Sequence, residues 1–479
     1  MSEQSRIFTS FGGIRQDLDD YIAAPDSSPD ACNMDTREGK LSVARGFSRA
    51  LPAAFSESTE LRRLYLYRRS DGSCRYLLAT ANDLYVYDAD TNTYRLLYQL
   101  GYPTASVQFD FLPMTIGSTE YLLIAYGREC ILKWDGESEN AEWFGSAEQL
   151  SNHPINFLEQ YCGRLFASGD YRYPNRLYWS QAPGDTRSVE DWSSDDASPD
   201  VSGGHVEVGT ESDPVTGLFA LSNQLLIFKR DSLYRLLGDR PSNFRIVRID
   251  ASFAPPIHTA CVRYGDRLFF LTRDGLYFYD GQTVRRTRNS RALQRTLKSA
   301  DFSECQSAAC GDTLYFAVKS FQSSVCNNLL IEYDVLTDRF MKRSGFGVMG
   351  LCPSMGKLYL LTHRGAVVQM DDSLTYDGDP IHAYWETHRM DLGHKGLKKH
   401  LKHLFCTGSG EHMRITVKLS EGRTYTADVL FDQEDDHVYD VLLNGEDRVF
   451  RIRFENVDGR PFTLDSNVTV LMETQLRPL

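Results

Sequence analysis

The stretch that decides the fold is RLFFLTRDGLYFYDG, residues 267–281. An apolar run is followed by Arg273-Asp274-Gly275, a polar segment that contains residue types typical of tight turns. A second, aromatic-rich run then ends at Asp280. Two such runs separated by a short polar turn predict a β-hairpin.

The same hairpin design recurs along the whole middle of the chain. Its seven units begin at Tyr76, Tyr121, Arg164, Gln224, Arg267, Thr313 and Lys357. Successive starts lie 45, 43, 60, 43, 46 and 44 residues apart, which leaves room for two more strands in each unit. Four-stranded units that cannot bury both faces alone stack radially, so the repeat predicts a β-propeller. We count seven blades, and six or eight would also fit because the ends of the repeat are irregular.

The one long spacing contains an insert. Residues 188–204 are rich in Ser, Asp, Pro and Gly, which predicts a surface loop between otherwise regular blades. Because exposed loops often carry binding contacts, the partner-contact candidates here are Asp191, Trp192, Asp195 and Asp196. Helical signal is sparse, and residues 290–298 are the best short candidate.

The sequence divides into three parts. Residues 1–55 are rich in Gly, Asp and Pro, and we expect an extended N-terminal arm that runs over the surface and in part completes a blade. Residues 56–375 hold the propeller repeat. Residues 376–479 contain alternating strands without the 45-residue spacing, which predicts a β-sandwich or jelly-roll-like domain. The predicted fold class is therefore all-β.

Composition narrows the function classes. The 479 residues are 42% hydrophobic with a net charge of −13, which argues against a protein that reads DNA sequence through basic contacts. No apolar run reaches the length of a membrane helix, and the first ten residues show no secretory signal, so we expect synthesis in a cytosol. The ten cysteines are scattered and none forms a CxxC pair, which favours buried thiols over disulfides.

Catalytic motifs are nearly absent from the sequence. There is no phosphate loop, GxSxG, HExxH or dinucleotide fingerprint, so we predict no enzyme activity and no cofactor. Asp88, Asp90 and Asn92 have calcium-loop spacing but lack the later ligands, which favours a simple turn. A patch of possible metal ligands lacks standard zinc spacing, and we predict no metal there: His394, His400, His403, Cys406 and His412.

Two basic clusters stand out in this acidic chain. The first comprises Arg285, Arg286, Arg288, Arg291, Arg295 and Lys298, and the second Lys395, Lys398, Lys399 and Lys402. Either could contact a DNA backbone or an acidic protein, and either could simply keep strand edges from pairing wrongly. We take the four lysines as further partner-contact candidates.

Three stretches resemble a known family. Residues 11–49 contain a Gly-Gly, a Pro spacer, an Ala-x-Asn-x-Asp segment and an Arg-Gly-aromatic end, carried by Gly12, Gly13, Pro29, Asn33, Asp35, Gly39, Arg45 and Gly46. Residues 175–194 and 213–238 form the second and third stretches, and residues 398–422 resemble an appended β-domain. Together they are similar to the propeller-type tail proteins of tailed bacteriophages and prophages, including tail nozzle or DNA-stabilisation proteins.

The resemblance implies a virion structural protein of the tail, acting as nozzle, hub or adaptor. Such a protein forms a homo-oligomeric ring, contributes to the DNA conduit during ejection and docks portal, adaptor and other tail proteins. Assembly takes place in the host bacterial cytoplasm. Acidic residues in a lumen would let DNA pass without sticking. Two alternatives stay open: a monomeric propeller binding module, either receptor-binding or a scaffold, and a propeller glycosidase or lyase.

Overall fold

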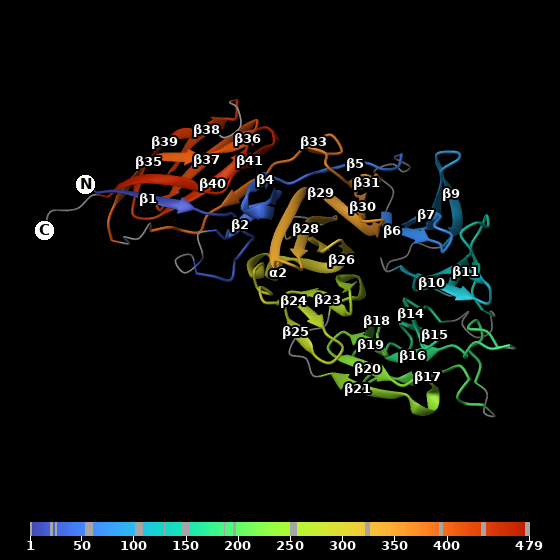
Figure 1. Ribbon diagram of the computed structural model, residues 1–479. Helices are drawn as coiled ribbons and strands as arrows, with labels where there is room; N and C mark the ends of the chain where they lie inside the picture. The colour runs from blue at the N-terminus through green and yellow to red at the C-terminus, as the bar shows by residue number, and fades with distance from the viewer. Residues whose placement is uncertain are drawn as a thin grey trace.

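The computed structural model describes residues 2–19, 23, 26–52, 61–100, 109–128, 130–145, 153–185, 187–194, 198–249, 256–320, 326–391, 396–432 and 437–474. Each predicted hairpin contributes the second and third strands of an antiparallel blade, and the blades follow one another around a ring (Figure 1). In the described part of the chain there are seven blades, so the fold is a seven-bladed β-propeller.

The first four blades have separate sheets. Blade 1 contains β6 (Leu61–Arg68), β7 (Cys74–Thr80), β8 (Asp83–Asp88) and β9 (Thr93–Gln99). Blade 2 contains β10 (Asp110–Ile116), β11 (Thr119–Ala125), β12 (Leu132–Trp134) and β13 (Glu142–Trp143). Blade 3 contains β14 (Phe157–Tyr161), β15 (Arg164–Ser168), β16 (Arg176–Trp179) and β17 (Gly204–Glu207). Blade 4 contains β18 (Val215–Leu221), β19 (Gln224–Lys229), β20 (Leu233–Leu237) and β21 (Arg245–Ile249).

The last three blades complete the ring. Blade 5 contains β22 (Cys261–Tyr264), β23 (Arg267–Thr272), β24 (Gly275–Tyr279) and β25 (Val284–Arg286). Blade 6 contains β26 (Asp301–Cys310), β27 (Thr313–Lys319), β28 (Asn327–Asp334) and the first half of the long β29 (Arg339–Ser354). Blade 7 contains the second half of β29, β30 (Lys357–Thr362), β31 (Val367–Met370) and the N-terminal strand β5 (Phe47–Arg49).

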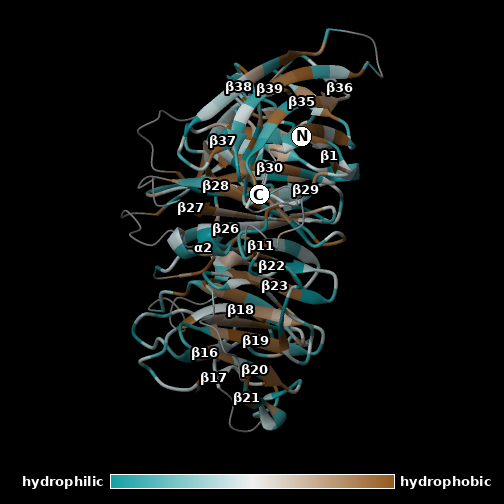
Figure 2. Cartoon of the chain, turned by 90° about the vertical axis from the view of Figure 1, so that its left-hand side faces the viewer, coloured by the Kyte–Doolittle hydropathy of each residue, from teal (hydrophilic) through white to brown (hydrophobic). Residues whose placement is uncertain are grey.

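Burial on both faces explains the continuous apolar runs that marked the repeat. Every residue of β19 is buried, and β23 is buried from Leu268 to Thr272. Each of these strands packs against a neighbouring blade on both of its faces. It therefore needs apolar residues at successive positions, rather than an alternation of apolar and polar residues. Hydrophobic residues accordingly concentrate on the strands and hydrophilic residues in the turns (Figure 2).

The long insert lies inside blade 3, between β16 and β17, rather than between two blades as the repeat suggested. Helical structure is short. The helix α2 (Gln294–Ser299) begins later than the predicted 290–298, and three 3₁₀ turns are η1 (Arg37–Gly39), η2 (Pro241–Asn243) and η3 (His258–Ala260). No helix in the described residues is long and apolar enough to cross a bilayer.

The C-terminal region is a β-sandwich, as predicted. One sheet contains β1 (Ser2–Phe8), β42 (Val468–Thr474), β35 (Lys399–Cys406) and β39 (Tyr439–Asp447). The second contains β2 (Asp30–Cys32), β34 (Tyr384–Glu386), β40 (Phe450–Asn456), β37 (His412–Leu419) and β38 (Thr424–Leu430). A small sheet contains β3 (Met34–Asp35), β4 (Leu41–Val43), β41 (Phe462–Leu464) and β36 (Gly408–Gly410), and the connection to the propeller contains β32 (Thr375–Tyr376) and β33 (Asp379–Pro380).

The N-terminal segment is not a surface arm, which corrects the expectation for residues 1–55. Its strands belong to the sandwich and to blade 7, and Phe11, Ile14 and Ala31 are at most 1% exposed. The physical reason is aromatic packing, since Phe11 makes edge contacts with Trp385 and Phe454 at 5.2 and 5.9 Å between ring centroids. The expectation that part of the segment completes a blade is confirmed by β5.

Candidate functional site

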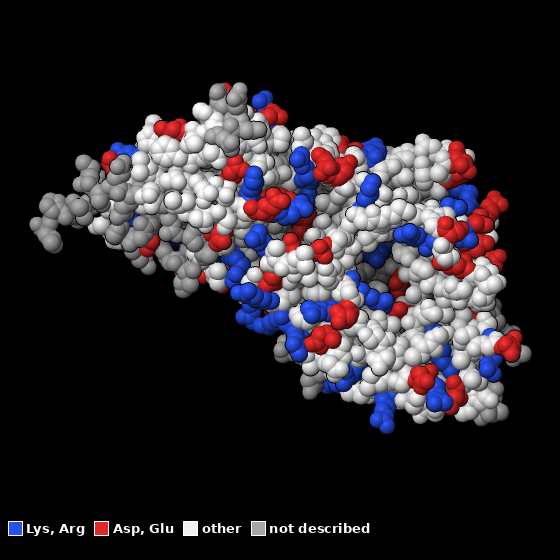
Figure 3. All heavy atoms as spheres, in the orientation of Figure 1, with Lys and Arg blue, Asp and Glu red and all other residues white. Residues whose placement is uncertain are grey.

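The first strands of several blades bring charged side chains together at the propeller axis. Figure 3 shows a hollow in the middle of the propeller with basic and acidic atoms in its wall. The axial cluster comprises Arg63 of β6, Asp110 of β10, Glu159 of β14, His258 of η3 and Arg263 of β22. Their contacts join blades that are far apart around the ring.

Glu159 and Arg263 form an ion pair that spans blade 4. The buried carboxylate of Glu159 accepts from the Arg263 guanidinium and, at 3.0 Å, from the backbone N–H of Ala220. Burial raises the pKa of Glu159 above its ordinary value, in spite of the opposing charge of Arg263. The pair links blades 3, 4 and 5 at the axis.

Asp110 and His258 form the second link. Their Oδ1 and Nε2 atoms lie 3.5 Å apart, and Asp110 Oδ2 accepts from the Leu158 N–H at 2.8 Å. Burial by itself would raise the pKa of Asp110, but the charge and hydrogen bond of His258 together with the Leu158 N–H hold it below its ordinary value. His258 stacks on Phe219 at 4.5 Å between ring centroids. A side chain at Gly217 would meet His258 within 3.0–3.2 Å, so glycine makes room for the imidazole.

Arg63 completes the axial cluster. Its Nε and Nη1 atoms are buried without a hydrogen-bond partner among the described residues, and burial lowers its pKa while the charge of Asp110 opposes this. His258 Nδ1 is also buried and without a partner in this part of the chain, so no nucleophile is hydrogen-bonded to it. The arrangement therefore pairs charges across the axis and places an acid–base pair there without an adjacent nucleophile.

The charge of Arg263 should offset part of the free-energy cost of burying the Glu159 carboxylate. Arg263→Met is expected to destabilise the protein by about 1–3 kcal/mol at neutral pH, because Glu159 loses its charge partner. The pKa of Glu159, already raised, then rises further. The folded state keeps a proton that the unfolded state releases, so stability falls as pH rises above the ordinary glutamate value of 4.5.

Thermal unfolding across a pH series measures this effect. The double variant Glu159→Gln/Arg263→Met should lose the added pH dependence, because no carboxyl group remains at the axis in blade 3. A single Arg263→Met variant with the wild-type pH dependence would contradict the prediction.

The insert residues have structural partners. Asp191 Oδ1 accepts from the N–H and hydroxyl of Ser193 at 2.8 and 2.7 Å, and the Trp192 side chain is 9% exposed within the core between blades 2 and 3. A partner would reach little of Trp192 in this position. Asp195 and Asp196 lie outside the described residues.

Three of the four C-terminal lysines lie in the described residues, and each has a partner within the protein. Lys399 is fully buried and donates to the Arg448 carbonyl at 2.8 Å, so its assignment as a partner contact is corrected: the side chain points into the sandwich. Burial lowers the pKa of its ammonium group. Lys398 and Lys402 are near Glu446 and Glu473 at 3.9 and 3.2 Å. Lys395 lies outside the described residues.

Three side chains of the patch of possible metal ligands have other surroundings in the structure. His403 pairs with Asp440 at 2.7 Å, His412 lies 3.6 Å from Asp428, and Cys406 is buried. His394 lies outside the described residues. In the described ranges no three His, Cys, Asp or Glu side chains are grouped to hold a metal ion, and the ten cysteines are free thiols. Asp88 forms a turn by accepting the N–H groups of Asp90 and Thr91.

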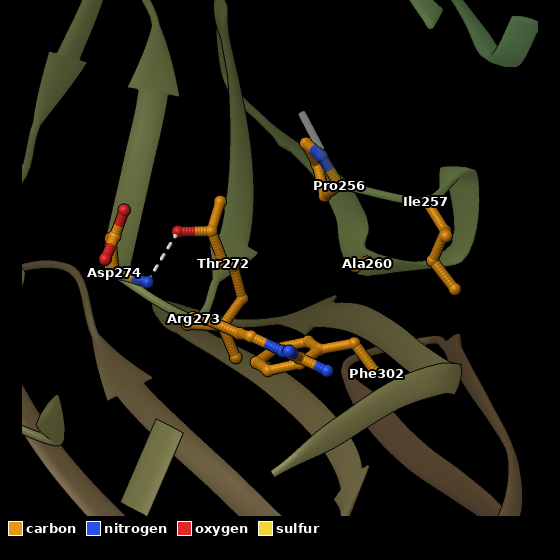
Figure 4. A pocket seen from close by; sticks show the side chains of 8 residues that line it. Pro256, Ile257, Ala260, Thr272, Arg273, Asp274 and Phe302 are labelled. Atoms are coloured by element: carbon orange, nitrogen blue, oxygen red, sulfur yellow. Dashed lines mark hydrogen bonds between the residues drawn. The ribbon is translucent and has the colours of Figure 1, made fainter. Parts of the chain in front are cut away.

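Two cavities are lined by residues other than the five of the axial cluster. One of about 200 Å³ lies between blades 5 and 6, and Figure 4 shows Arg273 beside the ring of Phe302 and the Asp274 N–H donating to Thr272. Its other lining residues are Pro256, Ile257, Ala260 and Leu271, so the wall is mostly apolar. A second cavity of about 300 Å³ separates the N-terminal segment from blade 6, with the buried Arg343–Glu332 ion pair in its wall.

The axial cluster could not be predicted from the sequence. Its residues share no motif, and their blades lie far apart in the chain. The available signal was a charge within a predicted buried strand, such as Glu159 between Leu158 and Gln160 in a run that begins with Phe157. Only the ring geometry brings these residues together.

Comparisons with known proteins identify no relative by sequence. No protein-family model matches the chain, and no curated protein matches it. BamB from Moraxella catarrhalis is similar in structure at 13% identity and a TM-score of 0.38, with 76% of this chain and 97% of that chain covered.

Two further solved structures match over a smaller share of their own length. The extracellular domain of a putative hybrid two-component system from B. thetaiotaomicron is 12% identical with a TM-score of 0.43, and the match covers 83% of this chain and 47% of that chain. Chaetomium thermophilum Raptor is 10% identical with a TM-score of 0.43, and the match covers 68% of this chain and 30% of that chain. The chain thus spans less than half the length of these two.

Proposed function

We propose that this chain is a structural protein of a bacteriophage tail, of the nozzle, hub or adaptor type. In this proposal it is assembled in the host cytoplasm, becomes part of the virion, forms part of the DNA conduit and docks other tail proteins. The observation that carries the proposal is where the family-like N-terminal motif lies. Two of its residues, Asn33 and Gly46, lie at the seam between propeller and sandwich.

Two motif residues have a clear physical role at this seam. Asn33 is 3% exposed and bonds to the backbone of Ser344 and His382 and to the hydroxyl of Tyr376. Gly46 lies so close to Thr375 that an added Cβ would stand 1.9 Å from its carbonyl oxygen. Asn33 and Gly46 are thus motif residues that the seam between the two domains requires. This supports, at the level of structure, the resemblance on which the function rests.

The axial cluster bears on where DNA would pass. The Glu159–Arg263 and Asp110–His258 contacts cross the centre of the propeller, so a duplex has no path through one copy. A conduit built from this chain would therefore be a space enclosed by several copies. That requirement favours the homo-oligomeric ring within the proposal.

Particles of the phage or prophage that encodes the chain provide the test. We expect a fixed number of copies per particle, and we expect gene deletion to give filled heads that lack infectivity until the gene is supplied in trans. Particles without the chain, or deletion mutants with normal infectivity, would contradict the proposal. Tight and strongly salt-sensitive DNA binding by the whole protein would argue against a lumen that DNA passes without sticking.

The alternative is a monomeric propeller binding module. It is favoured by the closure of blade 7 by the chain's own strand β5, which makes a single copy structurally complete. Light scattering with negative-stain imaging separates the two functions when carried out on purified particles and on their dissociated parts. A ring with an open channel supports the conduit, and a protein released only as single copies supports the module.

A further inference from the structure

The outer edge of blade 5 carries a set of exposed cations. They occupy β25, the following turn and α2, and we call them the basic strip: Arg285, Arg286, Arg288, Arg291, Arg295 and Lys298. In Figure 3 blue atoms gather over the place where Figure 1 labels β25 and α2. Such a concentration of positive charge is unusual on a chain whose net charge is −13.

Four of the six cations of the basic strip form no ion pair among the described residues. Arg285 pairs with Asp280 at 2.9 Å and Arg286 donates to the Tyr277 hydroxyl at 2.9 Å. The remaining four cations form no ion pair with any described residue. Protection of a strand edge accounts for Arg285 and Arg286, which lie on β25. It does not account for Arg288, Arg291, Arg295 and Lys298, which lie beyond the strand.

Blades 1 and 2 carry a matching set of anions. The acidic edge comprises Asp88 and Asp90 in the β8–β9 turn and Glu139 and Glu142 at β13. Asp90, Glu139 and Glu142 are exposed, whereas Asp88 is half-buried and its pKa is lowered by the Asp90 N–H and by the nearby charge of Arg95. None of the four lies within ion-pair distance of a cation among the described residues. The Arg95 guanidinium bonds to the Glu139 and Ser138 carbonyls, which brings the two blades into one surface. Red atoms gather at this edge in Figure 3.

The two surfaces lie on opposite sides of the propeller. Blades follow one another around the ring, and blade 5 is three blades from blade 1 in one direction and three from blade 2 in the other. Complementary surfaces at opposite sides of one subunit give a head-to-tail contact, which forms a ring or a filament depending on the rotation between copies.

Apolar side chains accompany the charges. Trp143 and Leu96 on the acidic edge are 47% and 45% exposed. Leu336, 72% exposed, belongs to the turn that contains Asp338, and Asp338 accepts from the Asn289 N–H in the middle of the basic strip. An exposed tryptophan ringed by charged groups is typical of protein interfaces, and arginine packs well on its face.

We propose that the basic strip docks on the acidic edge of a second copy of this chain. Duplex DNA would also attract the strip, but it would need neither the four unpaired acids on the opposite edge nor the exposed apolar residues at both surfaces. The proposal deepens the proposed function and rests on it for its role in a tail ring. Its test uses the purified chain alone, so the two can fail separately.

Two neutralising variants test the pairing. The strip variant is Arg288→Gln/Arg291→Gln/Arg295→Gln/Lys298→Gln. The edge variant is Asp88→Asn/Asp90→Asn/Glu139→Gln/Glu142→Gln, in which asparagine at position 88 can still accept the turn N–H groups. A control variant removes four exposed cations from the C-terminal region: Arg389→Gln/Arg423→Gln/Arg448→Gln/Arg460→Gln.

Sedimentation velocity at low and high ionic strength measures self-association. We expect the wild type and the control to associate at low salt and to dissociate at high salt. Each neutralised variant should associate roughly 30-fold more weakly, from four charge pairs of ordinary surface strength. An equimolar mixture of the strip and edge variants should form a one-to-one dimer and nothing larger, because each partner keeps one working surface.

Three results would overturn the proposal. The first is a wild-type chain that stays monomeric at low salt, including the case in which it binds duplex DNA through the strip instead. The second is an edge variant that associates like the wild type. The third is a mixture of the two variants that stays monomeric although circular dichroism and melting show both to be folded.

Discussion

Replacing Phe11 with alanine is expected to lower the free energy of unfolding by about 3–5 kcal/mol. Phe11 is fully buried and its ring meets the edges of Trp385 and Phe454 in the sandwich. Truncation leaves a cavity among rigid aromatic rings, which the neighbouring sheets fill only in part. Chemical denaturation followed by tryptophan fluorescence measures the loss, because Trp385 reports on the same site.

Ile7 provides a matched control for this effect. It lies on the adjoining strand β1 but is 50% exposed, so Ile7→Ala should change stability by less than about 1 kcal/mol. Equal effects of the two substitutions would mean that the N-terminal segment is not anchored through Phe11.

Asn33→Ala is expected to destabilise the protein by about 3–4 kcal/mol, the second largest effect. The amide group donates to the Ser344 and His382 carbonyls at 3.0 and 2.8 Å. Its oxygen accepts from the Ser344 N–H and the Tyr376 hydroxyl, both at 2.9 Å. Alanine leaves these buried groups without partners. Water cannot take the place of the lost amide group unless the seam opens.

The backbone contribution of Asn33 must be separated from its hydrogen bonds. Asn33 has a φ of 56°, a left-handed conformation that alanine adopts at a cost of about 1 kcal/mol. Asn467 has a φ of 71° and an exposed side chain, so Asn467→Ala measures that backbone cost alone. Thermal melts of both variants measure the two losses of stability, and their difference is the contribution of the Asn33 hydrogen bonds. A loss at position 33 no larger than at position 467 would show that the hydrogen bonds contribute little.

The propeller was predictable because its evidence is local. Each blade contains a hairpin of neighbouring residues, such as the pairing of Arg267–Thr272 with Gly275–Tyr279, and burial on both faces demands continuous apolar runs. The seven predicted units correspond to the second and third strands of the seven blades observed in the described residues. Local pattern was therefore enough to give the number of blades.

The N-terminal segment and the axis were not predictable in the same way. Phe47 pairs with Met370, so the strand β5 gains its partner from the far side of the repeat. Polar and glycine-rich residues around Phe11 resemble a surface arm until the aromatic residues of the sandwich are placed beside it. Likewise, His258 reaches Asp110 only because the ring brings η3 opposite β10. Long-range contacts leave no periodic signature in the sequence.

The pairing of strands that lie far apart in the sequence has a consequence for biosynthesis. Ser2 lies opposite Thr474 and Phe47 lies opposite Met370, so β1 and β5 are made well before the strands that pair with them. The nascent protein must carry the unpaired edges of β1 and β5 until those partner strands are made, and such edges are prone to aggregate. Contacts so distant along the chain also make folding slow. Synthesis of β42, rather than completion of any single blade, is therefore the step that permits the native state.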